Sequence, residues 1–441
     1  MKYPAYPKYK KSGVEWLGDL PEHWEVKRLK TSAIHWVSNV DKVPSENEVP
    51  VKLCNYTDVY YNDFITSDME LMETTATKEE IEKFHLNEED VVITKDSESW
   101  DDIAISALVT KTTPDLVCGY HLAIIRPKKE KLSGRYLLRE LQCSQVNHQF
   151  QIAATGVTRY GLPKSAIGEA LIPLPPFSEQ QAIAAFLDRE TGRIDSLISK
   201  KQKLIELLKE KRTALISRAV TKGLSPKVKM KPSGVEWLGD VPEHWAVVSL
   251  RHLFDIKAGG DLKEEFYSEE KTEQHFYPIY TNSIKSNEVY GFSSKPFFKS
   301  NTITVTGRGE IGYATYRDHE YDAIIRLLVL TPKKKVPCKY YVYFINSMLN
   351  FFGGSTAVSQ LSTEQISPYK VFIPPFPEQQ VIVDFLDHET NKIAALIAKV
   401  ETVIEKLKEY RTGLISAAVT GKIMVGTRCI VPLRVGKTHE I

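Results

Sequence analysis

Two stretches of the sequence repeat apolar residues with the period of a long helix. Between 374 and 423 they are spaced three and four residues apart, the pattern of a coiled-coil seam, at Ile393, Leu396, Val400, Val403, Leu407, Tyr410 and Leu414. The stretch from 175 to 222 matches at Ile194, Leu197, Leu204, Leu208 and Leu215, with Lys201 and Lys211 interrupting the seam. A helix with one apolar stripe is not stable alone in water. We therefore predict that the two helices pair within one molecule, antiparallel.

Shorter patterns fill the segments between these helices. Runs of β-branched residues bounded by turn residues predict strands, at 90–94, 104–109 and 122–126 in the first half and at 301–306, 312–316 and 324–330 in the second. Helical segments are expected at 136–143 and 340–349. Both halves therefore contain a mixed α/β segment.

The chain carries one sequence frame twice. SGVEWLGDLPEHWEVKRL at 12–29 and SGVEWLGDVPEHWAVVSL at 233–250 are identical at 14 of 18 positions. The helical stretches 175–222 and 374–421 are identical at 29 of 48 positions. The segments between these matched pieces barely resemble each other. Matched repeats with different inserts predict one scaffold whose two inserts recognise two different ligands or sequences.

These patterns define the expected fold and its divisions. The fold class is α+β, with two globular α/β domains separated by two long helices that form an antiparallel intramolecular coiled coil, in a pseudo-two-fold internal repeat. The predicted divisions are a first globular domain (1–174), its helix (175–222), a linker (223–232), a second globular domain (233–373), its helix (374–423) and a tail (424–441).

Composition narrows the function classes. The 441 residues include 42% hydrophobic and 26% charged residues, as in a globular protein with a real core. The net charge of +2 gives no global signal for nucleic acid, so such a signal must be local. Five scattered cysteines without a C-x-x-C pair argue against zinc and against disulfides. With no signal peptide and no membrane-spanning run, we expect a cytoplasmic protein with no membrane partner.

Two motifs resemble those of nucleotide-using enzymes, but their context differs. Gly307–Gly312 has the form G-x-G-x-x-G, yet a strand pattern follows where a dinucleotide site needs a helix. A Gly-rich hairpin carrying Arg308 is the better interpretation. Leu174-Pro175-Pro176-Phe177 and its repeat at 373–376 resemble the Asn/Asp-Pro-Pro-aromatic motif of amino-methyltransferases. Leucine and isoleucine cannot make the hydrogen bond that this motif supplies.

The remaining motifs predict structure instead of catalysis. The sequence has no P-loop, H-E-x-x-H, G-x-S-x-G or nuclease-type carboxylate-lysine cluster. His23 and His244 recur in the PEHW motifs, each beside a tryptophan and without a nucleophile, which favours a packing role. We therefore predict no catalytic residue, no metal site and no cofactor site in this chain.

Polar and basic residues in the inserts are candidates for DNA contact, because such side chains grip phosphates and read base edges. Solvated loops are an equally good interpretation of these segments from the residues alone. The candidates in the first domain are Lys95, Ser97, Arg159, Tyr160 and Lys164, and in the second Lys285, Arg308, Arg317 and Gln360. The loop 355–360 that ends at Gln360 is the counterpart of 155–161 in the first half.

The two PEHW motifs, the PLPPFSEQQAIAAFLD segment and the paired repeats together resemble the DNA-specificity subunit of type I restriction-modification systems. The resemblance covers about residues 12–422. It implies that each insert is a target recognition domain reading one half of a split DNA sequence. It further implies that the repeated helices set the gap between the halves, and that unlike inserts read an asymmetric target.

The resemblance also implies partners and cofactors. The partners would be double-stranded DNA, two methyltransferase subunits, and restriction/translocase subunits. Adenosylmethionine, ATP and Mg would act on those partner subunits and not in this chain. Two competing functions remain at this point: a methyltransferase or nuclease with motifs that escape the sequence reading, and a scaffold or decoy that has the helices but reads no sequence.

Overall fold

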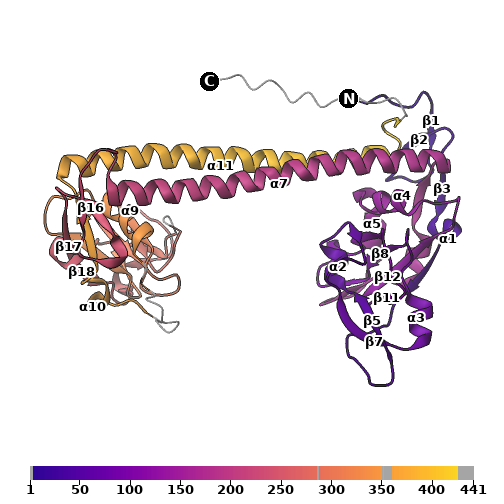
Figure 1. The fold of residues 1–441 in the computed structure, drawn as a ribbon, viewed down its shortest axis with the longest axis horizontal. Helices are drawn as coiled ribbons and strands as arrows, with labels where there is room; N and C mark the ends of the chain where they lie inside the picture. Colours follow the sequence, from indigo (N-terminus) through magenta and orange to yellow (C-terminus); the bar gives the residue numbers. More distant parts are fainter. Residues whose placement is uncertain (1–2, 286–287, 350, 352–359, 426–441) are drawn as a thin grey trace. The chain divides into compact units, whose positions relative to one another are not determined.

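The computed structural model describes residues 3–285, 288–349, 351 and 360–425, which fold into two compact units (Figure 1). Unit 1 contains Met1–Lys200 and Thr402–Ile441, and unit 2 contains Lys201–Glu401. Both long helices, α7 (Phe177–Lys222) and α11 (Phe376–Val419), are therefore divided between the units. The predicted divisions had treated each helix as a segment of its own.

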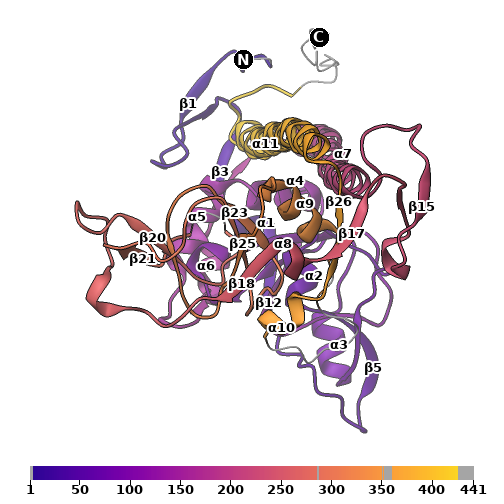
Figure 2. The same ribbon diagram turned by 90° about the vertical axis from the view of Figure 1, so that its left-hand side faces the viewer.

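The two long helices run antiparallel. In unit 1, Leu187 near the start of α7 lies in the same buried cluster as Ile415 near the end of α11. In unit 2, Val220 near the end of α7 shares a buried cluster with Leu386 near the start of α11. Figures 1 and 2 both show the helices side by side. The predicted antiparallel pairing within one molecule is confirmed.

The buried seam of α11 keeps the predicted heptad period, but at every second predicted position the more buried residue is the one that follows it in the sequence. On α11, Ile404 is buried whereas Val403 is 41% exposed. The reason is that apolar residues occupy adjacent positions, so that two seams one residue apart satisfy the same pattern. Large apolar side chains left exposed along the two helices are Leu197, Leu204, Leu207, Phe376, Val381, Phe385, Leu396, Val403 and Tyr410.

The body of unit 1 contains two larger sheets and the two-stranded pair of β9 (Asp96–Ser97) with β13 (Tyr160–Gly161). The five-stranded sheet has the order β4-β12-β8-β10-β6, with β4 (Ala33–Val37), β12 (Leu122–Pro127), β8 (Val91–Thr94), β10 (Ser106–Val109) and β6 (Phe64–Ile65). The second sheet has the order β11-β5-β7, with β11 (Leu116–Cys118), β5 (Val49–Cys54) and β7 (Met72–Ala76). The helices of this body are α2 (Tyr56–Tyr60), α3 (Lys78–Phe84), α4 (Gly134–Leu141), α5 (Ser144–Ala153) and α6 (Lys164–Glu169).

The body of unit 2 contains two four-stranded sheets. The first is antiparallel in the order β18-β25-β22-β23, with β18 (Phe254–Ala258), β25 (Leu328–Pro332), β22 (Thr302–Val305) and β23 (Ala314–Arg317). The second has the order β19-β21-β20-β24, with β19 (Tyr267–Ser268), β21 (Gly291–Ser293), β20 (Tyr277–Tyr280) and β24 (Asp322–Ala323). Its helices are α9 (Cys338–Met348) and the short α10 (Thr363–Ile366).

Short elements connect the bodies to the helices. In unit 1 they are α1 (Leu29–Ser32) and the pairs β1 (Tyr9–Lys11) with β2 (Asp19–Pro21) and β3 (Glu25–Arg28) with β14 (Leu171–Leu174). In unit 2 they are α8 (Leu250–Leu253) and the pairs β15 (Met230–Pro232) with β16 (Asp240–Pro242) and β17 (Ala246–Ser249) with β26 (Lys370–Ile373). Residues 230–232 of the predicted linker therefore form a strand.

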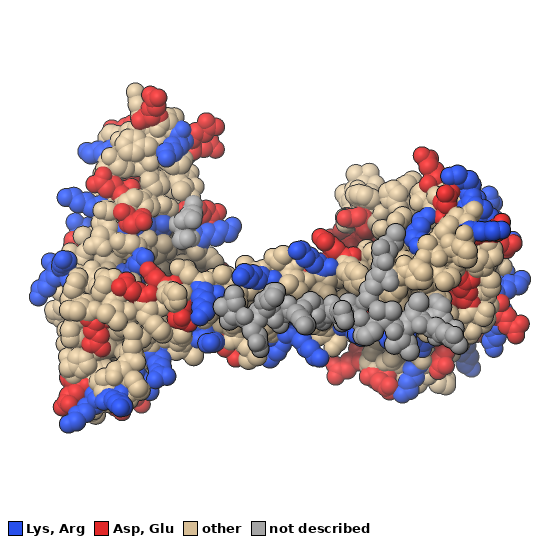
Figure 3. All heavy atoms as spheres, turned by 90° about the horizontal axis from the view of Figure 1, so that it is seen from above, with Lys and Arg blue, Asp and Glu red and all other residues tan. Residues whose placement is uncertain are grey.

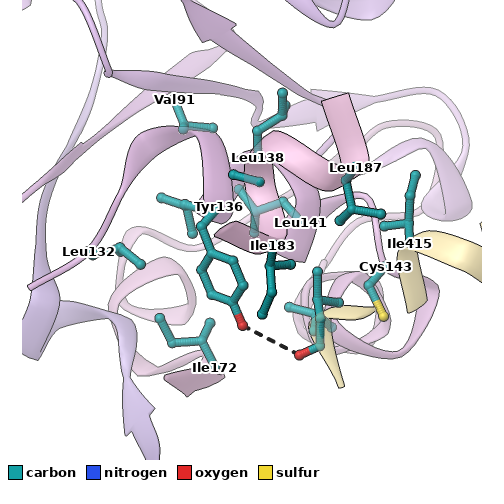
Figure 4. Close-up of a cluster of buried hydrophobic side chains, with 14 of the residues drawn as sticks. Val91, Leu132, Tyr136, Leu138, Leu141, Cys143, Ile172, Ile183, Leu187 and Ile415 are labelled. Atoms are coloured by element: carbon teal, nitrogen blue, oxygen red, sulfur yellow. Dashed lines mark hydrogen bonds between the residues drawn. The ribbon is translucent and has the colours of Figure 1, made fainter. Parts of the chain in front are cut away.

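The core of unit 1 joins the globular body to both long helices (Figure 4). Tyr136 on α4 is fully buried, and its hydroxyl donates to the carbonyl of Val419 at the end of α11, with the two oxygens 3.4 Å apart. In unit 2, the Tyr340 hydroxyl on α9 donates to the Val220 carbonyl at 3.0 Å. Helices expected at 136–143 and 340–349 thus anchor each body to a helix end.

One predicted strand is interrupted. The run at 324–330 is apolar except for Arg326, but the backbone turns at Ile325 and Arg326, which have φ angles of 53° and 59°. This turn separates β24 from β25. Among the described residues, no helix combines the length and the apolar character needed to cross a bilayer.

Candidate nucleic-acid interface

Each PEHW motif is fixed to the start of a long helix by the same set of hydrogen bonds. In unit 1, the carboxylate of Glu179 in the first turn of α7 bonds to His23 Nε2 at 2.8 Å and accepts from Trp24 Nε1 at 3.2 Å. In unit 2, Glu378 does the same for His244 at 2.8 Å and for Trp245 at 3.1 Å. The two repeated pieces of sequence are therefore one structural joint, present twice, in which each histidine is paired with a glutamate.

Four of the five candidates in the first domain are linked through one region. Lys95 and Asp96 directly follow the end of β8. The next strand, β9 (Asp96–Ser97), pairs with β13 (Tyr160–Gly161), so that Ser97 lies opposite Tyr160. Lys95 Nζ lies 2.8 Å from a carboxylate oxygen of Asp96. Asp96 also bonds to His121 Nδ1 at 2.7 Å, and Arg159 Nη2 lies 3.1 Å from His121 Nε2.

The surroundings of Asp96 favour the charged form of its own carboxyl. Burial alone would raise the pKa of its carboxyl, but hydrogen bonds from Lys95 and His121 bring the pKa below its usual value. The carboxylate neutralises part of the charge of Lys95, whose side chain is only 22% exposed. The exposed Arg159 is therefore the better placed of the two cations for a polyanion.

The other candidates of unit 1 differ in accessibility. Ser97 is 8% exposed, and its hydroxyl accepts from the Ser99 backbone N–H at 3.2 Å. Lys164 is exposed at the start of α6, where its carbonyl is bonded to His35 Nε2. No contact among the described residues joins Lys164 to the Asp96 cluster.

A second cluster forms in unit 2 around the Gly-rich hairpin. Strands β22 and β23 pair antiparallel, which confirms a hairpin instead of a strand-helix nucleotide site. Arg308 Nη2 donates to Gln360 Oε1 at 3.2 Å, so two candidates meet. Asn282 Oδ1 accepts from the backbone N–H groups of Gly307 at 2.6 Å and Arg308 at 3.2 Å, which fixes the hairpin tip.

Lys285 and Arg317 have opposite surroundings. Lys285 is exposed in the loop that follows β20. Arg317 is 3% exposed, donates to Thr304 Oγ1 at 3.1 Å and lies over the Tyr280 ring at 3.5 Å. The buried Arg317 guanidinium therefore stabilises the domain interior, which argues against its predicted contact with DNA. Residues 355–359 of the predicted loop lie outside the described residues.

Several accessible residues near the two clusters were not among the candidates. Trp100 follows the Lys95 loop and is 49% exposed, and Tyr60 and Tyr56 stack with ring centroids 5.5 Å apart. Asn282 lies two residues after the end of β20, where the sequence pattern predicts no strand, so no signal singles it out. Tyr120 and His121 could not be found either, because they interrupt an apolar run that predicts only a strand.

Charge is mixed on the visible surface. On the face shown in Figure 3, basic and acidic side chains are interspersed over both units. Mixed charge accords with the net charge of +2. Attraction to a polyanion would then depend on a few local cations such as Arg159 and Arg308.

Comparison with known proteins identifies the family. The family model described as "Type I restriction modification DNA specificity domain" matches residues 21–207 and again 242–406. A putative type I restriction enzyme MjaX specificity subunit from Methanocaldococcus jannaschii is 24% identical over 428 residues, which cover 93% of this chain and 96% of that protein. The type I restriction enzyme MjaVIII specificity subunit from the same organism is 24% identical over 433 residues, with coverage of 92% and 94%.

Solved structures share the fold. A chain from a study of complex assembly and conformational transition of the type I R-M system aligns with a TM-score of 0.71 and 16% identity, over 91% of this chain and 98% of that chain. The HsdS subunit from Thermoanaerobacter tengcongensis aligns with a TM-score of 0.55 and 16% identity, over 92% and 98%. With the family model matching both halves of the sequence, this chain belongs to the type I restriction-modification DNA specificity family.

Proposed function

We propose that this chain, a non-catalytic specificity subunit, reads a bipartite and asymmetric DNA target and positions methyltransferase and restriction subunits on it. One observation carries the proposal. The same joint between PEHW motif and helix occurs in both units, with histidine to glutamate distances of 2.8 Å, yet the attached bodies differ in sheet composition. A repeated joint that carries two different globular bodies is suited to a DNA target with two different halves.

The same repeat supports a pair of methyltransferase subunits. Each unit offers one copy of the joint and an exposed apolar residue at the same position of the helix repeat, Leu204 in unit 2 and Val403 in unit 1. Two like surfaces are suited to two like subunits. The complex would then hold one specificity chain for two methyltransferase chains, a ratio that native mass spectrometry measures directly.

Catalysis and its cofactors belong to the partners in this proposal. Adenosylmethionine would bind the methyltransferase, and ATP and Mg the restriction subunit, while this chain contributes position and sequence choice. The methyl-accepting adenine would be turned out of the helix by the methyltransferase. Such a complex works on chromosomal DNA, so we place this chain in the cytoplasm.

Co-expression with its methyltransferase in a methylation-free host tests the function. Methylome sequencing should reveal modified adenines in one split motif with two different halves, and omission of this chain should abolish the modification. Modification without sequence preference would favour a scaffold. Modification or cutting of DNA by the purified chain alone would favour an enzyme.

A further inference from the structure

Both units carry a tight turn at the same place in their sheets. In unit 1, residues 120–121 lie between β11 and β12; in unit 2, residues 325–326 lie between β24 and β25. The Tyr120 N–H donates to the carbonyl of Val40 at 2.7 Å, and the Ile325 N–H donates to the carbonyl of Gly260 at 3.0 Å. Val40 and Gly260 each form a parallel bridge with the residue just before the turn. The turns are therefore structural equivalents in two bodies whose sequences barely resemble each other.

Both turns hold side chains in an unfavourable backbone conformation. The φ angles are 71° at His121, 53° at Ile325 and 59° at Arg326. Glycine and asparagine enter this left-handed region easily, whereas a β-branched residue such as isoleucine does so rarely. Strain of this kind persists only where the surroundings fix it, and it occurs most often at sites of function.

The strained turns present their side chains to solvent. Tyr120 is 40% exposed and Ile325 is 44% exposed. Arg326 is exposed as well, and its guanidinium makes no ion pair with any residue that the structure describes. An exposed isoleucine beside an exposed arginine, on a turn that glycine would form more easily, contributes nothing to the core of the domain.

Each turn adjoins the cluster of candidate DNA contacts in its own unit. In unit 1, the Lys95 N–H donates to the His121 carbonyl at 2.8 Å, and Arg159 lies against the His121 ring. In unit 2, Asn282 Nδ2 donates to the Ile325 carbonyl at 2.7 Å.

The hairpin of unit 2 also fits closely against its turn. A Cβ atom on Gly307 would lie 2.9 Å from the Arg326 carbonyl oxygen, so only glycine permits this approach of hairpin to turn. The same Asn282 side chain that bonds to the turn also bonds to the backbone of Arg308. Turn and hairpin thus form one rigid surface.

We propose that these two turns are base-reading elements, one for each half of the target, acting through Tyr120 in unit 1 and through Ile325 and Arg326 in unit 2. This inference rests on the proposed function and deepens it by naming specificity-determining residues. Base edges fit the chemistry better than phosphates do, because an isoleucine can contact a thymine methyl group but offers nothing to a phosphate. The adjoining Arg159 and Arg308 then supply the attraction to the backbone.

The test is methylome sequencing of Tyr120→Ala and Arg326→Ala, each co-expressed with the methyltransferase. We expect each variant to accept a second base at one position of one half, with a loss of discrimination of about tenfold or more. The two variants should affect different halves. Ile34→Ala and Arg251→Ala are matched controls, because both side chains are exposed and lie far from the turns. Ile34 is the second residue of β4, opposite Arg126, and Arg251 lies in α8, just before β18. The controls should leave the motif unchanged.

Different results bear on different claims. Folded variants that keep full discrimination at every position, or that lose modification equally at all sequences, overturn base reading by the turns. Should an alanine variant fail to fold, Tyr120→Phe and Arg326→Lys keep the shape of the turn, and an unchanged motif in both would overturn the inference. A wild-type chain that directs no sequence-specific modification would overturn the proposed function as well.

Discussion

Gly421 lies against the indole of Trp24, two residues after the end of α11. The first turn of α7 meets the same indole, because Glu179 accepts its N–H. One tryptophan thus ties together the start of one long helix and the end of the other. Unit 2 repeats the relationship, with Gly223 after α7 lying against Trp245. The sequence of the PEHW motif is repeated because this joint is repeated.

Gly421→Ala should destabilise unit 1 by about 2–3 kcal/mol. Its φ is 68°, and an added Cβ would lie 2.4 Å from Pro21 Cδ. Gly223→Ala should cost less, since its φ is similar at 71° but the nearest atom is the carboxylate of Glu378 at 3.2 Å. Chemical denaturation measures both. Gly413→Ala is the control, because it lies inside α11 with nothing within 4 Å, and should gain stability by about 1 kcal/mol. A larger loss at Gly223 than at Gly421 would contradict this account.

Much of the fold could be predicted from the sequence because the pattern is long and repeated. The helices, their pairing and most central strands of both bodies follow from it. The exact seam could not be predicted, because Val403 and Ile404 are both apolar and spacing alone does not choose between them. In the structure, Ile404 is the buried residue of this pair. The turn at 325–326 was hidden for a similar reason, since isoleucine is a poor indicator of a left-handed backbone.

The candidate site was predicted in part. Arg308 and Gln360 were proposed separately, and the structure brings them together. Arg317 directly follows the strand predicted at 312–316, but β23 includes it, and its register places it opposite Thr302 in the sheet. An error of one residue at a strand end therefore turned a buried side chain into a candidate contact.

Arg317→Met should mainly reduce stability, whereas Arg308→Ala should mainly reduce DNA binding. Removal of the buried Arg317 guanidinium takes away its bond to Thr304 and its packing on Tyr280, and should cost about 2–4 kcal/mol of stability. Arg308→Ala should change stability by less than about 0.5 kcal/mol but reduce binding of the target DNA by the assembled complex. Thermal melts and fluorescence anisotropy distinguish the two effects. A stable Arg317→Met chain with impaired DNA binding would restore Arg317 as a contact residue.

Glu140 should make unit 1 sensitive to pH. It is fully buried on α4, and burial raises the pKa of its carboxyl well above the usual range, with the Tyr136 hydroxyl offsetting only part of the effect. The folded chain keeps a proton that the unfolded chain releases above about pH 4.5. Stability contributed by this proton therefore falls as pH rises toward the folded pKa, by at most about 1.4 kcal/mol per pH unit.

The difference in unfolding free energy between Glu140→Gln and wild type measures this effect. It should grow in favour of the variant between pH 5 and pH 8, because glutamine has no proton to lose. Glu140→Leu serves as a second comparison, since unit 2 carries the buried Phe344 on the corresponding helix α9. Curves for wild type and variant that stay parallel across this range would show that Glu140 is charged in the folded chain.

Val403→Asp and Ile404→Asp should separate assembly from folding at adjacent positions of α11. Ile404 is 6% exposed in the helix seam, so a buried carboxylate there should cost several kcal/mol and unfold the region. Val403 is 41% exposed, so Asp should be tolerated by the isolated chain. If the exposed apolar stripe docks a methyltransferase subunit, Val403→Asp desolvates a charge on binding, and co-purification of that subunit should fall at least tenfold while circular dichroism and melting temperature stay unchanged. Unimpaired co-purification would show that the methyltransferase subunit does not cover Val403.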